Sequence, residues 1–186
     1  MLVLASASPR RRELLQNAGI AFSVQPSDIP EVPLAGEAAR YFAERLAREK
    51  ALAVFQLSPK DPVLGADTIV VADGEILAKP RDREDAARML RSLSRRQHQV
   101  ITGVCLIGET IPADIRSATT LVTMGKIEEK EIQDYITGGE PMDKAGAYAI
   151  QGIASRWITK IQGDYSNVVG LPVPLVWKML RQHGVV

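Results

Sequence analysis

The sequence is poor in the residues that mark several common protein classes. It has one cysteine, Cys105, so an internal disulfide and a cysteine-based zinc site are excluded, and a reducing compartment is expected. Three Phe, four Tyr and two Trp form no cluster on which single-stranded nucleic acid could stack. Lysine and arginine number 23 against 22 acidic residues, so the strong basic excess of a duplex-DNA binder is missing.

Long hydrophobic runs and several catalytic motifs are missing as well. No apolar stretch approaches the length that spans a bilayer, and the apolar run at residues 2–5 is too short for a signal peptide. The chain has no GxxxxGK[ST] phosphate loop and no GxSxG elbow, and its two histidines, His98 and His183, are not spaced as metal ligands. We therefore expect a soluble, cytoplasmic protein that binds neither nucleic acid nor a membrane.

The hydrophobic pattern predicts an α/β fold. Asp73-Gly74 indicates a tight hairpin turn of type I′, and strands alternate with helices early in the chain. We expect one domain over residues 1–186, with a mixed twisted sheet, flanking helices and two lobes around a deep cleft. The expected strands are 2–5, 21–25, 62–72, 75–78, 98–107 and 115–123, with a last hairpin turning at 162–164; the expected helices are 9–18, 36–56, 82–93, 128–136 and 172–182.

Three consecutive arginines, at positions 10 to 12, follow the first predicted strand. Ser8 is a good N-cap and Pro9 fits the first helical position, so these arginines lie in the first turns of a helix. Guanidinium groups are unfavourable at the positive end of a helix dipole unless an anion lies among them. The arginines form either a solvated face or a cradle for phosphate.

Several polar residues interrupt apolar patterns and are candidates for a site. Asp67 lies in a hydrophobic strand, where it forms either a structural ion pair or part of a catalytic site, and Thr68 faces the opposite side unless Gly65 introduces a bulge. Lys50 projects from an apolar helix face, toward solvent or into a cleft. The hairpin carries Lys79 toward the end of the sheet that holds Asp67.

Cations and acids of this kind together suit a polyphosphate with a hard divalent ion. The cations would neutralise phosphate charge, while carboxylates, including Glu31 in a proline-rich loop, would hold the metal or a water molecule.

Six motifs occur in the order in which they occur in the Maf family, which the sequence therefore resembles over its whole length. The family comprises nucleoside triphosphate pyrophosphatases, also described as septum-formation inhibitors. The motifs are Ser6-Ala7-Ser8-Pro9-Arg10-Arg11, Leu46-Ala47-Arg48-Glu49-Lys50-Ala51, Gly65-Ala66-Asp67-Thr68-Ile69-Val70, Lys79-Pro80-Arg81, the segment from Asp143 to Gly152, and Asn167-Val168-Val169-Gly170-Leu171-Pro172.

The resemblance implies a fold related to the inosine triphosphate pyrophosphatases, often dimeric, so we expect a homodimer. It implies hydrolysis of the bond between the α and β phosphates with Mg²⁺ or Mn²⁺, and a role in arresting cell division. Asp67-Thr68 with Gln151 is similar to the branch that acts on dTTP and UTP, whereas a sister branch acts on 7-methyl-GTP. By the same resemblance Asp67 is the catalytic acid or base and a metal ligand with Glu31; base choice is set by Arg10, Thr68 and Gln151, and the triphosphate is held by Ser6, Arg11, Lys50 and Lys79.

At Glu31 the preceding Pro30 departs from the commoner Asp-Ile-Asp-Glu pattern of the family. A non-catalytic nucleotide sensor that regulates septum formation through partner proteins is the rival reading. Such a sensor would need the cations but not Asp67.

Overall fold

The computed structural model describes residues 1–57 and 59–186 and confirms the predicted α/β class. Within these residues the strands form one seven-stranded sheet in the order β2-β1-β3-β5-β6-β7, with β4 paired to β3. The strands are β1 (Leu2–Leu4), β2 (Phe22–Val24), β3 (Val63–Ala72), β4 (Glu75–Leu77), β5 (Gln97–Ile107), β6 (Asp114–Met124) and β7 (Ile158–Gln162). The helices are α1 (Pro9–Asn17), α2 (Ala39–Phe55), α3 (Arg83–Leu93), α4 (Glu129–Thr137), α5 (Tyr165–Val169) and α6 (Val173–Gln182).

The sheet is mixed, as expected. Strand β1 pairs in parallel with β2 and β3, whereas β3 with β4 and β6 with β7 are antiparallel. Asp73 and Gly74 both have positive φ, 49° and 82°, as a type I′ turn requires. Among the described residues, no helix is long and apolar enough to cross a membrane.

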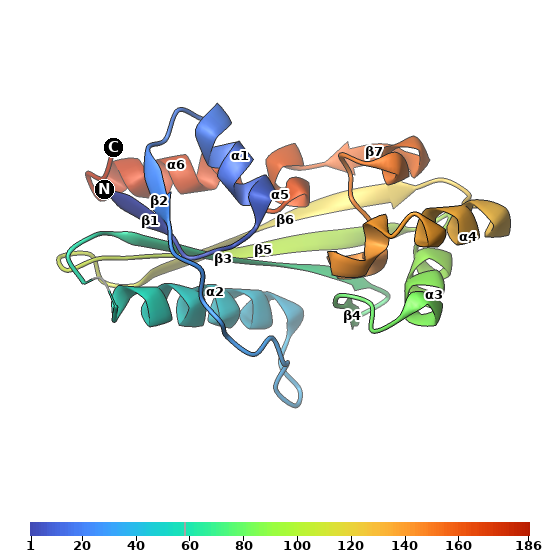
Figure 1. Ribbon diagram of the computed structural model, residues 1–186, viewed down its shortest axis with the longest axis horizontal. Helices are drawn as coiled ribbons and strands as arrows, with labels where there is room; N and C mark the ends of the chain where they lie inside the picture. The colour runs from blue at the N-terminus through green and yellow to red at the C-terminus, as the bar shows by residue number, and fades with distance from the viewer. Residues whose placement is uncertain (58) are drawn as a thin grey trace. The chain divides into compact units, whose positions relative to one another are not determined.

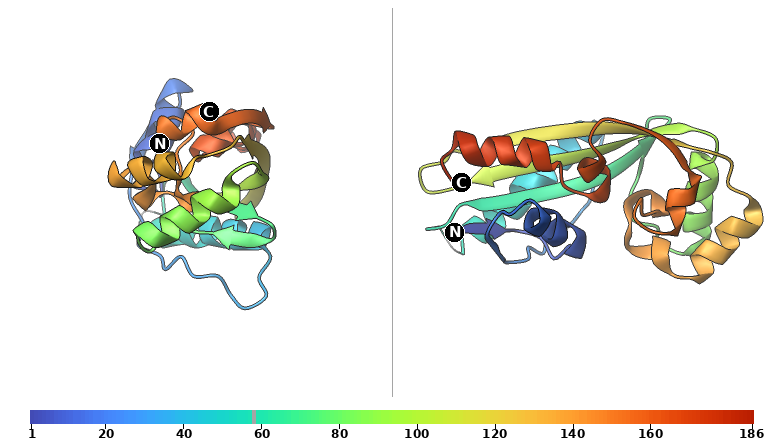
Figure 2. Two further views of the ribbon diagram at one scale, coloured as in Figure 1. Left: turned by 90° about the vertical axis from the view of Figure 1, so that its right-hand side faces the viewer. Right: turned by 90° about the horizontal axis from the view of Figure 1, so that it is seen from above.

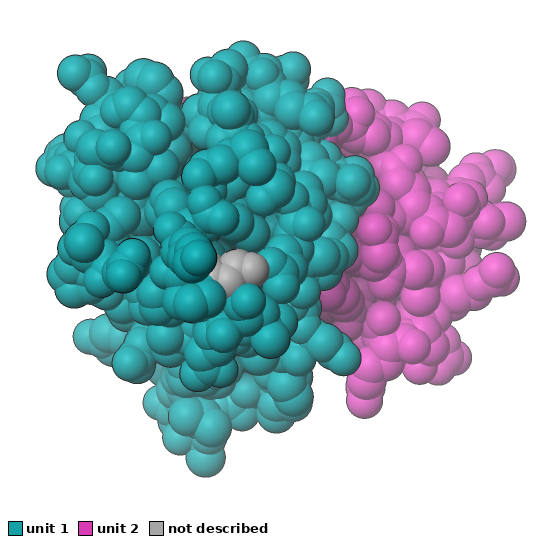
Figure 3. Space-filling view, turned by 60° about the vertical axis from the view of Figure 1, so that its left-hand side comes forward, with its two compact units in different colours: residues 1–68, 102–118, 170–186 teal, residues 69–101, 119–169 magenta. Residues whose placement is uncertain are grey.

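The chain divides into two compact units (Figure 3). Unit 1 comprises Met1–Thr68, Thr102–Ala118 and Gly170–Val186, and unit 2 comprises Ile69–Ile101 and Thr119–Val169. Because strands β3, β5 and β6 each contribute residues to both units, the division falls within strands and not at a linker.

In unit 1, helices cover both faces of the sheet: α2 lies on one face, and α1 and α6 lie on the other (Figures 1 and 2). Side chains alternate along a strand, so each strand contributes to two separate cores. Even-numbered residues such as Leu4 and Leu64 pack with Leu15 of α1 and Met179 of α6. Odd-numbered residues such as Val3 and Val63 pack instead with alanines of α2.

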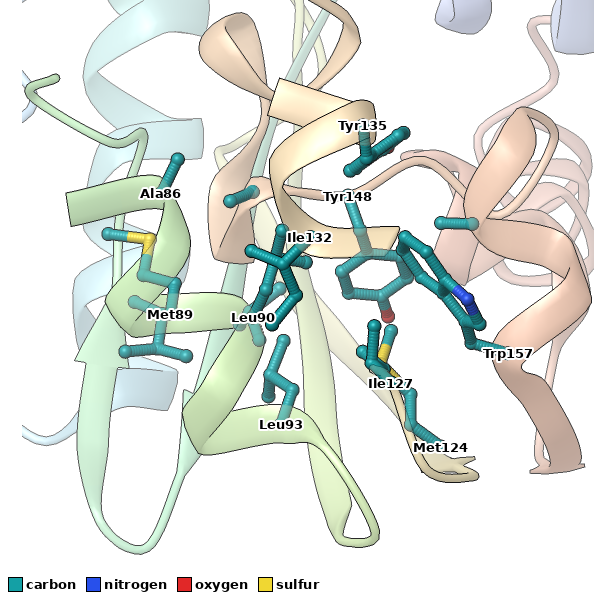
Figure 4. Packing of buried hydrophobic residues seen from close by; sticks show 14 of the residues in the cluster. Ala86, Met89, Leu90, Leu93, Met124, Ile127, Ile132, Tyr135, Tyr148 and Trp157 are labelled. Atoms are coloured by element: carbon teal, nitrogen blue, oxygen red, sulfur yellow. The ribbon is translucent and has the colours of Figure 1, made fainter. Parts of the chain in front are cut away.

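In unit 2, a single buried cluster joins α3 and α4 to the strands (Figure 4). Leu90 and Leu93 of α3 pack with Ile132 and Tyr135 of α4. The Tyr135 ring contacts Trp157 edge to face, with centroids 5.1 Å apart. This contact holds Tyr135 in place near the end of α4. The segment 138–157 that follows contains three short 3₁₀ helices: η1 (Glu140–Asp143), η2 (Ala145–Ala147) and η3 (Ile153–Trp157).

The predicted last hairpin is wrong. Strand β7 ends at Gln162, but the chain then enters helix α5 instead of a return strand. The Asp164 carboxylate accepts hydrogen bonds from the backbone N–H and the hydroxyl of Ser166, at 2.8 and 2.7 Å. An acid that satisfies free N–H groups in this way favours the start of a helix over a strand.

Candidate active site

Strand β3 presents Asp67 and Thr68 on opposite faces of the sheet. Asp67 has the parity of Val63, which packs in the α2 core, and Thr68 has the parity of Leu64, which packs in the α1 and α6 core. The expectation that Thr68 faces away from Asp67 is confirmed by its partners, which include Arg11 of α1. The two residues therefore belong to two different networks.

Gly65 allows α2 to approach the Asp67 face closely. A Cβ atom at Gly65 would lie 2.2 Å from the carbonyl oxygen of Ala47 and 2.8 Å from the nitrogen of Ala51. At Gly103 of β5 a Cβ would lie 2.3 Å from the carbonyl oxygen of Ala43. Helix α2 thus rests on two strands at positions where only glycine fits, and Gly65 serves this contact.

This close packing places the Lys50 ammonium between two carboxylates. Its Nζ donates to Asp67 Oδ1 and to Glu31 Oε1, both at 2.6 Å. The side chains of Lys50 and Asp67 are 9% and 8% exposed, while that of Glu31 is 38% exposed. Lys50 therefore points inward, and the alternative of a side chain that reaches solvent is wrong.

Burial governs the protonation of Asp67. Desolvation raises the pKa of its carboxyl above the usual aspartate value, and the positive charges of Lys50 and Arg11 partly oppose that rise. A buried carboxyl whose pKa is raised by desolvation and lowered by specific positive charges is common in catalytic sites.

The donor set of this face fits a magnesium ion that is bound together with substrate. Glu31 and Asp67 direct oxygens at one point, the Lys50 ammonium. The described part of the chain holds no cluster of three or more His, Cys, Asp or Glu able to bind a metal. Mg²⁺ typically takes one or two carboxylates and completes its shell with substrate phosphates and water, which is what this pair can offer.

On the opposite face, Arg11 is bound by the protein itself. Four of its five N–H donors meet protein acceptors: Nε donates to the Gly170 carbonyl (2.8 Å), Nη1 to Ser6 Oγ (3.1 Å) and the Ala66 carbonyl (2.9 Å), and Nη2 to Thr68 Oγ1 (3.1 Å). Burial lowers its pKa, whereas Asp67 and Glu31 raise it. In this conformation Arg11 joins α1, β3 and the segment before α6.

The Thr68 hydroxyl is also fully engaged. It donates to the Gly170 carbonyl at 3.2 Å, accepts from Arg11 Nη2 at 3.1 Å, and lies 2.9 Å from the hydroxyl of Thr102. One donated and two accepted bonds use the capacity of a hydroxyl group. Thr102 was not singled out from the sequence, although a threonine in the apolar part of β5 is a signal that could have identified it. Gly170 belongs to the last of the six motifs, but no role was predicted for it.

The N-terminal motif forms the helix start that was predicted. Ser8 caps α1 and Pro9 opens it. The buried Ser6 hydroxyl accepts from the Ser8 N–H at 3.3 Å as well as from Arg11. Arg10 is half-buried and Arg12 is exposed, so the three arginines differ in environment and are not one solvated face.

Unit 1 thus brings together Ser6, Arg11 and Thr68 in one network and Glu31, Lys50 and Asp67 in another. Lys79 and Gln151 belong to unit 2, and both are exposed. Lys79 follows β4, whose last paired residue, Leu77, lies opposite Val70. Gln151 lies in the turn between η2 and η3.

Comparison with known proteins places these residues in a family context. The family model described as "Maf-like protein" matches residues 1–183. A protein of Koribacter versatilis (strain Ellin345) named dTTP/UTP pyrophosphatase is 57% identical over 184 residues, which cover 99% of this chain and 95% of that protein. A protein of the same name from Geobacter sp. (strain M21) is 50% identical, covering 98% of this chain and 95% of its own length.

Among solved structures, the Ham1 protein of Staphylococcus aureus matches 66% of this chain and 71% of its own, with a TM-score of 0.46 and 16% identity. The relation to the inosine triphosphate pyrophosphatase fold stays a prediction at this level of similarity.

Proposed function

The chain belongs to the Maf family, and from this we propose that it is a nucleoside triphosphate pyrophosphatase acting on dTTP and UTP. Full-length relatives that carry this name support the proposal. In the reaction, water attacks the α phosphorus, the bond from the α phosphorus to the bridging oxygen of the β phosphate breaks, and nucleoside monophosphate and pyrophosphate leave.

One observation carries the chemistry: a buried aspartate carboxylate is held by a buried ammonium in the Lys50–Asp67 pair. We propose that Asp67 orients or deprotonates the attacking water, or holds the metal that does so. A structural ion pair alone would not require the exposed Glu31 to share the same ammonium. The bound divalent ion, Mg²⁺ or Mn²⁺, would be held by Glu31 and Asp67 and would neutralise triphosphate charge.

The remaining cations are proposed to bind the triphosphate. Arg10 and Lys79 are candidates for phosphate contact, and Lys50 lies beside the proposed catalytic carboxylate. Arg10 also keeps the part in base choice that the family resemblance implies. Most N–H donors of Arg11 bond to the protein itself. Its proposed role is therefore to fix the Ser6–Ser8 turn at the helix N-terminus. Such fixed cations stabilise the negative charge that develops on the leaving pyrophosphate.

We propose that base choice depends on Gln151. Uracil and thymine present two carbonyl acceptors with an N–H donor between them, and a glutamine amide can both donate and accept. The proposed contribution of Thr68 is its small size, since its hydroxyl already has three protein partners. The family resemblance supports four further proposals. They are a single catalytic domain over residues 1–186, a cytoplasmic location, a homodimer, and a role in division arrest.

A nucleotide panel tests this function directly. Purified protein is incubated with UTP, dTTP, CTP, GTP, ATP or 7-methyl-GTP, with Mg²⁺, with Mn²⁺ or with a chelator, and the products are separated. We expect UMP or dTMP with pyrophosphate from UTP and dTTP, weak cleavage of CTP, hardly any of ATP, and no turnover with the chelator. Nucleoside diphosphate and phosphate as products would contradict the α–β assignment, and a preference for 7-methyl-GTP would contradict the branch.

A further inference from the structure

The turn that carries Gln151 is gripped at both ends by two side chains from outside it. The Tyr135 hydroxyl accepts from the Ala149 N–H at 3.3 Å, and Glu140 Oε2 accepts from the Ile153 N–H at 3.4 Å. The same tyrosine hydroxyl donates to Glu140 Oε1 at 3.0 Å. The chain from residue 149 to residue 153 is therefore bracketed by one continuous hydrogen-bonded pair.

The grip on this turn is anchored in the core of unit 2. Tyr135 is 1% exposed and packs against Trp157. Burial and the neighbouring Glu140 raise the pKa of the Tyr135 phenol, so the hydroxyl keeps its proton and remains a donor to the carboxylate. The Glu140 main chain is held in addition by Lys144, whose Nζ donates to the Glu140 carbonyl at 2.6 Å.

Gly152 shows how closely the Glu140 carboxylate lies against the turn. A Cβ at Gly152 would be 1.8 Å from Glu140 Oε1 and 2.5 Å from its Cδ. The backbone of Gly152, with φ −100° and ψ −154°, does not itself lie in the left-handed region that requires glycine. With the Glu140 side chain held in this conformation, its carboxylate occupies the space that a Cβ at position 152 would need.

The Gln151 side chain is exposed at the middle of this bracketed turn. We propose that Glu140, through Tyr135 and the turn 149–153, is a positioning residue for base selectivity: it fixes the backbone from which Gln151 reads the pyrimidine. A glutamine side chain selects a base only when its amide is held at the right place. A misplaced amide leaves hydrogen-bonding groups unpaired with the right base as well as with the wrong one, so it does not discriminate between them. The inference rests on the proposed role of Gln151 in base choice.

The test compares kcat and KM for UTP and CTP in the parent and in single-residue variants. Glu140→Ala removes the grip, and we expect the UTP-over-CTP ratio of kcat/KM to fall by about tenfold or more, mainly through a higher KM for UTP. Glu140→Gln should retain part of the preference, since its amide oxygen can still accept from one of the two donors, the Ile153 N–H or the Tyr135 hydroxyl, that the carboxylate binds. Asp134→Ala, which removes an exposed acid of α4 paired with Lys130, is the matched control and should change neither ratio nor KM.

Gln151→Ala separates this inference from the function on which it rests. If Gln151→Ala loses the preference while Glu140→Ala keeps it, the positioning role is wrong and the proposed function stands. If Gln151→Ala keeps the preference, the reading role of Gln151 and the positioning role fall together. The double variant that combines Glu140→Ala with Gln151→Ala should be no less selective than Gln151→Ala alone, because both changes act on one interaction.

Tyr135→Phe provides the second route if Glu140→Ala does not fold. It keeps the ring that packs on Trp157 but removes the hydroxyl that joins Ala149 to Glu140. We expect the same loss of UTP preference as in Glu140→Ala. An unchanged preference in folded Tyr135→Phe would overturn the proposal.

Discussion

Lys50 illustrates how one residue can depend on its neighbours for both position and effect. The sequence indicated only that a lysine leaves an apolar helix face, because the two acids that it contacts lie 17 and 19 positions away in the chain. Its partners follow from the glycine contact between α2 and β3, which no local pattern contains. The sequence analysis named these three residues as candidates, while their pairing could be found only in the fold.

The pH dependence of catalysis should report the Lys50–Asp67 pair. In its proposed role as a base or ligand, Asp67 must be ionised, so we expect activity to fall as the pH drops through its raised pKa. Lys50→Met removes a charge that lowers this pKa, and we expect the acidic limb of kcat/KM for dTTP to move to higher pH, together with a lower maximum.

The control for this profile is Lys130→Met, which removes an exposed lysine of α4. Its acidic limb should coincide with that of the parent. An acidic limb in Lys50→Met that stays in place or moves to lower pH would show that Asp67 does not determine the profile.

Arg11 shows that a sequence can single out a residue without revealing its contacts. The run of arginines indicated phosphate binding because the helix dipole disfavours cations there. In the structure, the Arg11 guanidinium is satisfied by the carbonyls of Ala66 and Gly170 and by two hydroxyls. Apart from the Ser6 hydroxyl, these acceptors come from segments far from position 11 in the chain, so no local pattern could reveal them.

At the scale of elements, hydrophobic periodicity gave the strands and long helices to within a few residues, since each buries one face or both. Helix α2 begins at Ala39, three residues after the expected start, and no side chain caps it. The last hairpin was predicted wrongly because the Asp164 carboxylate accepts from the Ser166 N–H and so favours the start of a helix. Gly65 was read as a possible bulge, whereas it serves a helix contact that only tertiary packing creates.

The seat of α2 on β3 gives a prediction of its own. In Gly65→Ala the new Cβ would meet the backbone of Ala47 at 2.2 Å, and backbone atoms cannot yield as a flexible side chain can. We expect a loss of about 1–3 kcal/mol in the free energy of unfolding, as overpacking usually costs. Activity should fall as well, because the new Cβ would push α2 away from β3 and so move Lys50 away from Asp67.

Gly138→Ala is the matched control for this substitution. A Cβ there would lie 3.3 Å from the Tyr135 carbonyl oxygen and 3.8 Å from that of Asp134, and the backbone is right-handed helical. Urea unfolding and dTTP turnover of the two variants decide the point. Equal stability of Gly65→Ala and the parent would mean that α2 does not rest on this glycine.

At the scale of the whole molecule, family membership and the buried carboxylate support the same account. The α/β class followed from alternating elements, and the order of six motifs identified the family before the structure was considered. Two lobes were expected, and the chain does divide into two compact units. The position of the division within strands β3, β5 and β6 could not be derived from the pattern, because each of these segments was predicted as one continuous strand.

The central claim is that Asp67 performs the chemistry of a pyrophosphatase, and Asp67→Asn tests it most directly. The amide keeps the shape of the carboxylate but cannot serve as base or anionic ligand, so kcat/KM for dTTP should fall by about 10²–10⁴-fold or more, while circular dichroism and urea unfolding show a folded protein. Asp73→Asn, at an exposed turn, should retain parental activity. A folded Asp67→Asn protein that releases pyrophosphate from dTTP within a few-fold of the parental rate would contradict the account.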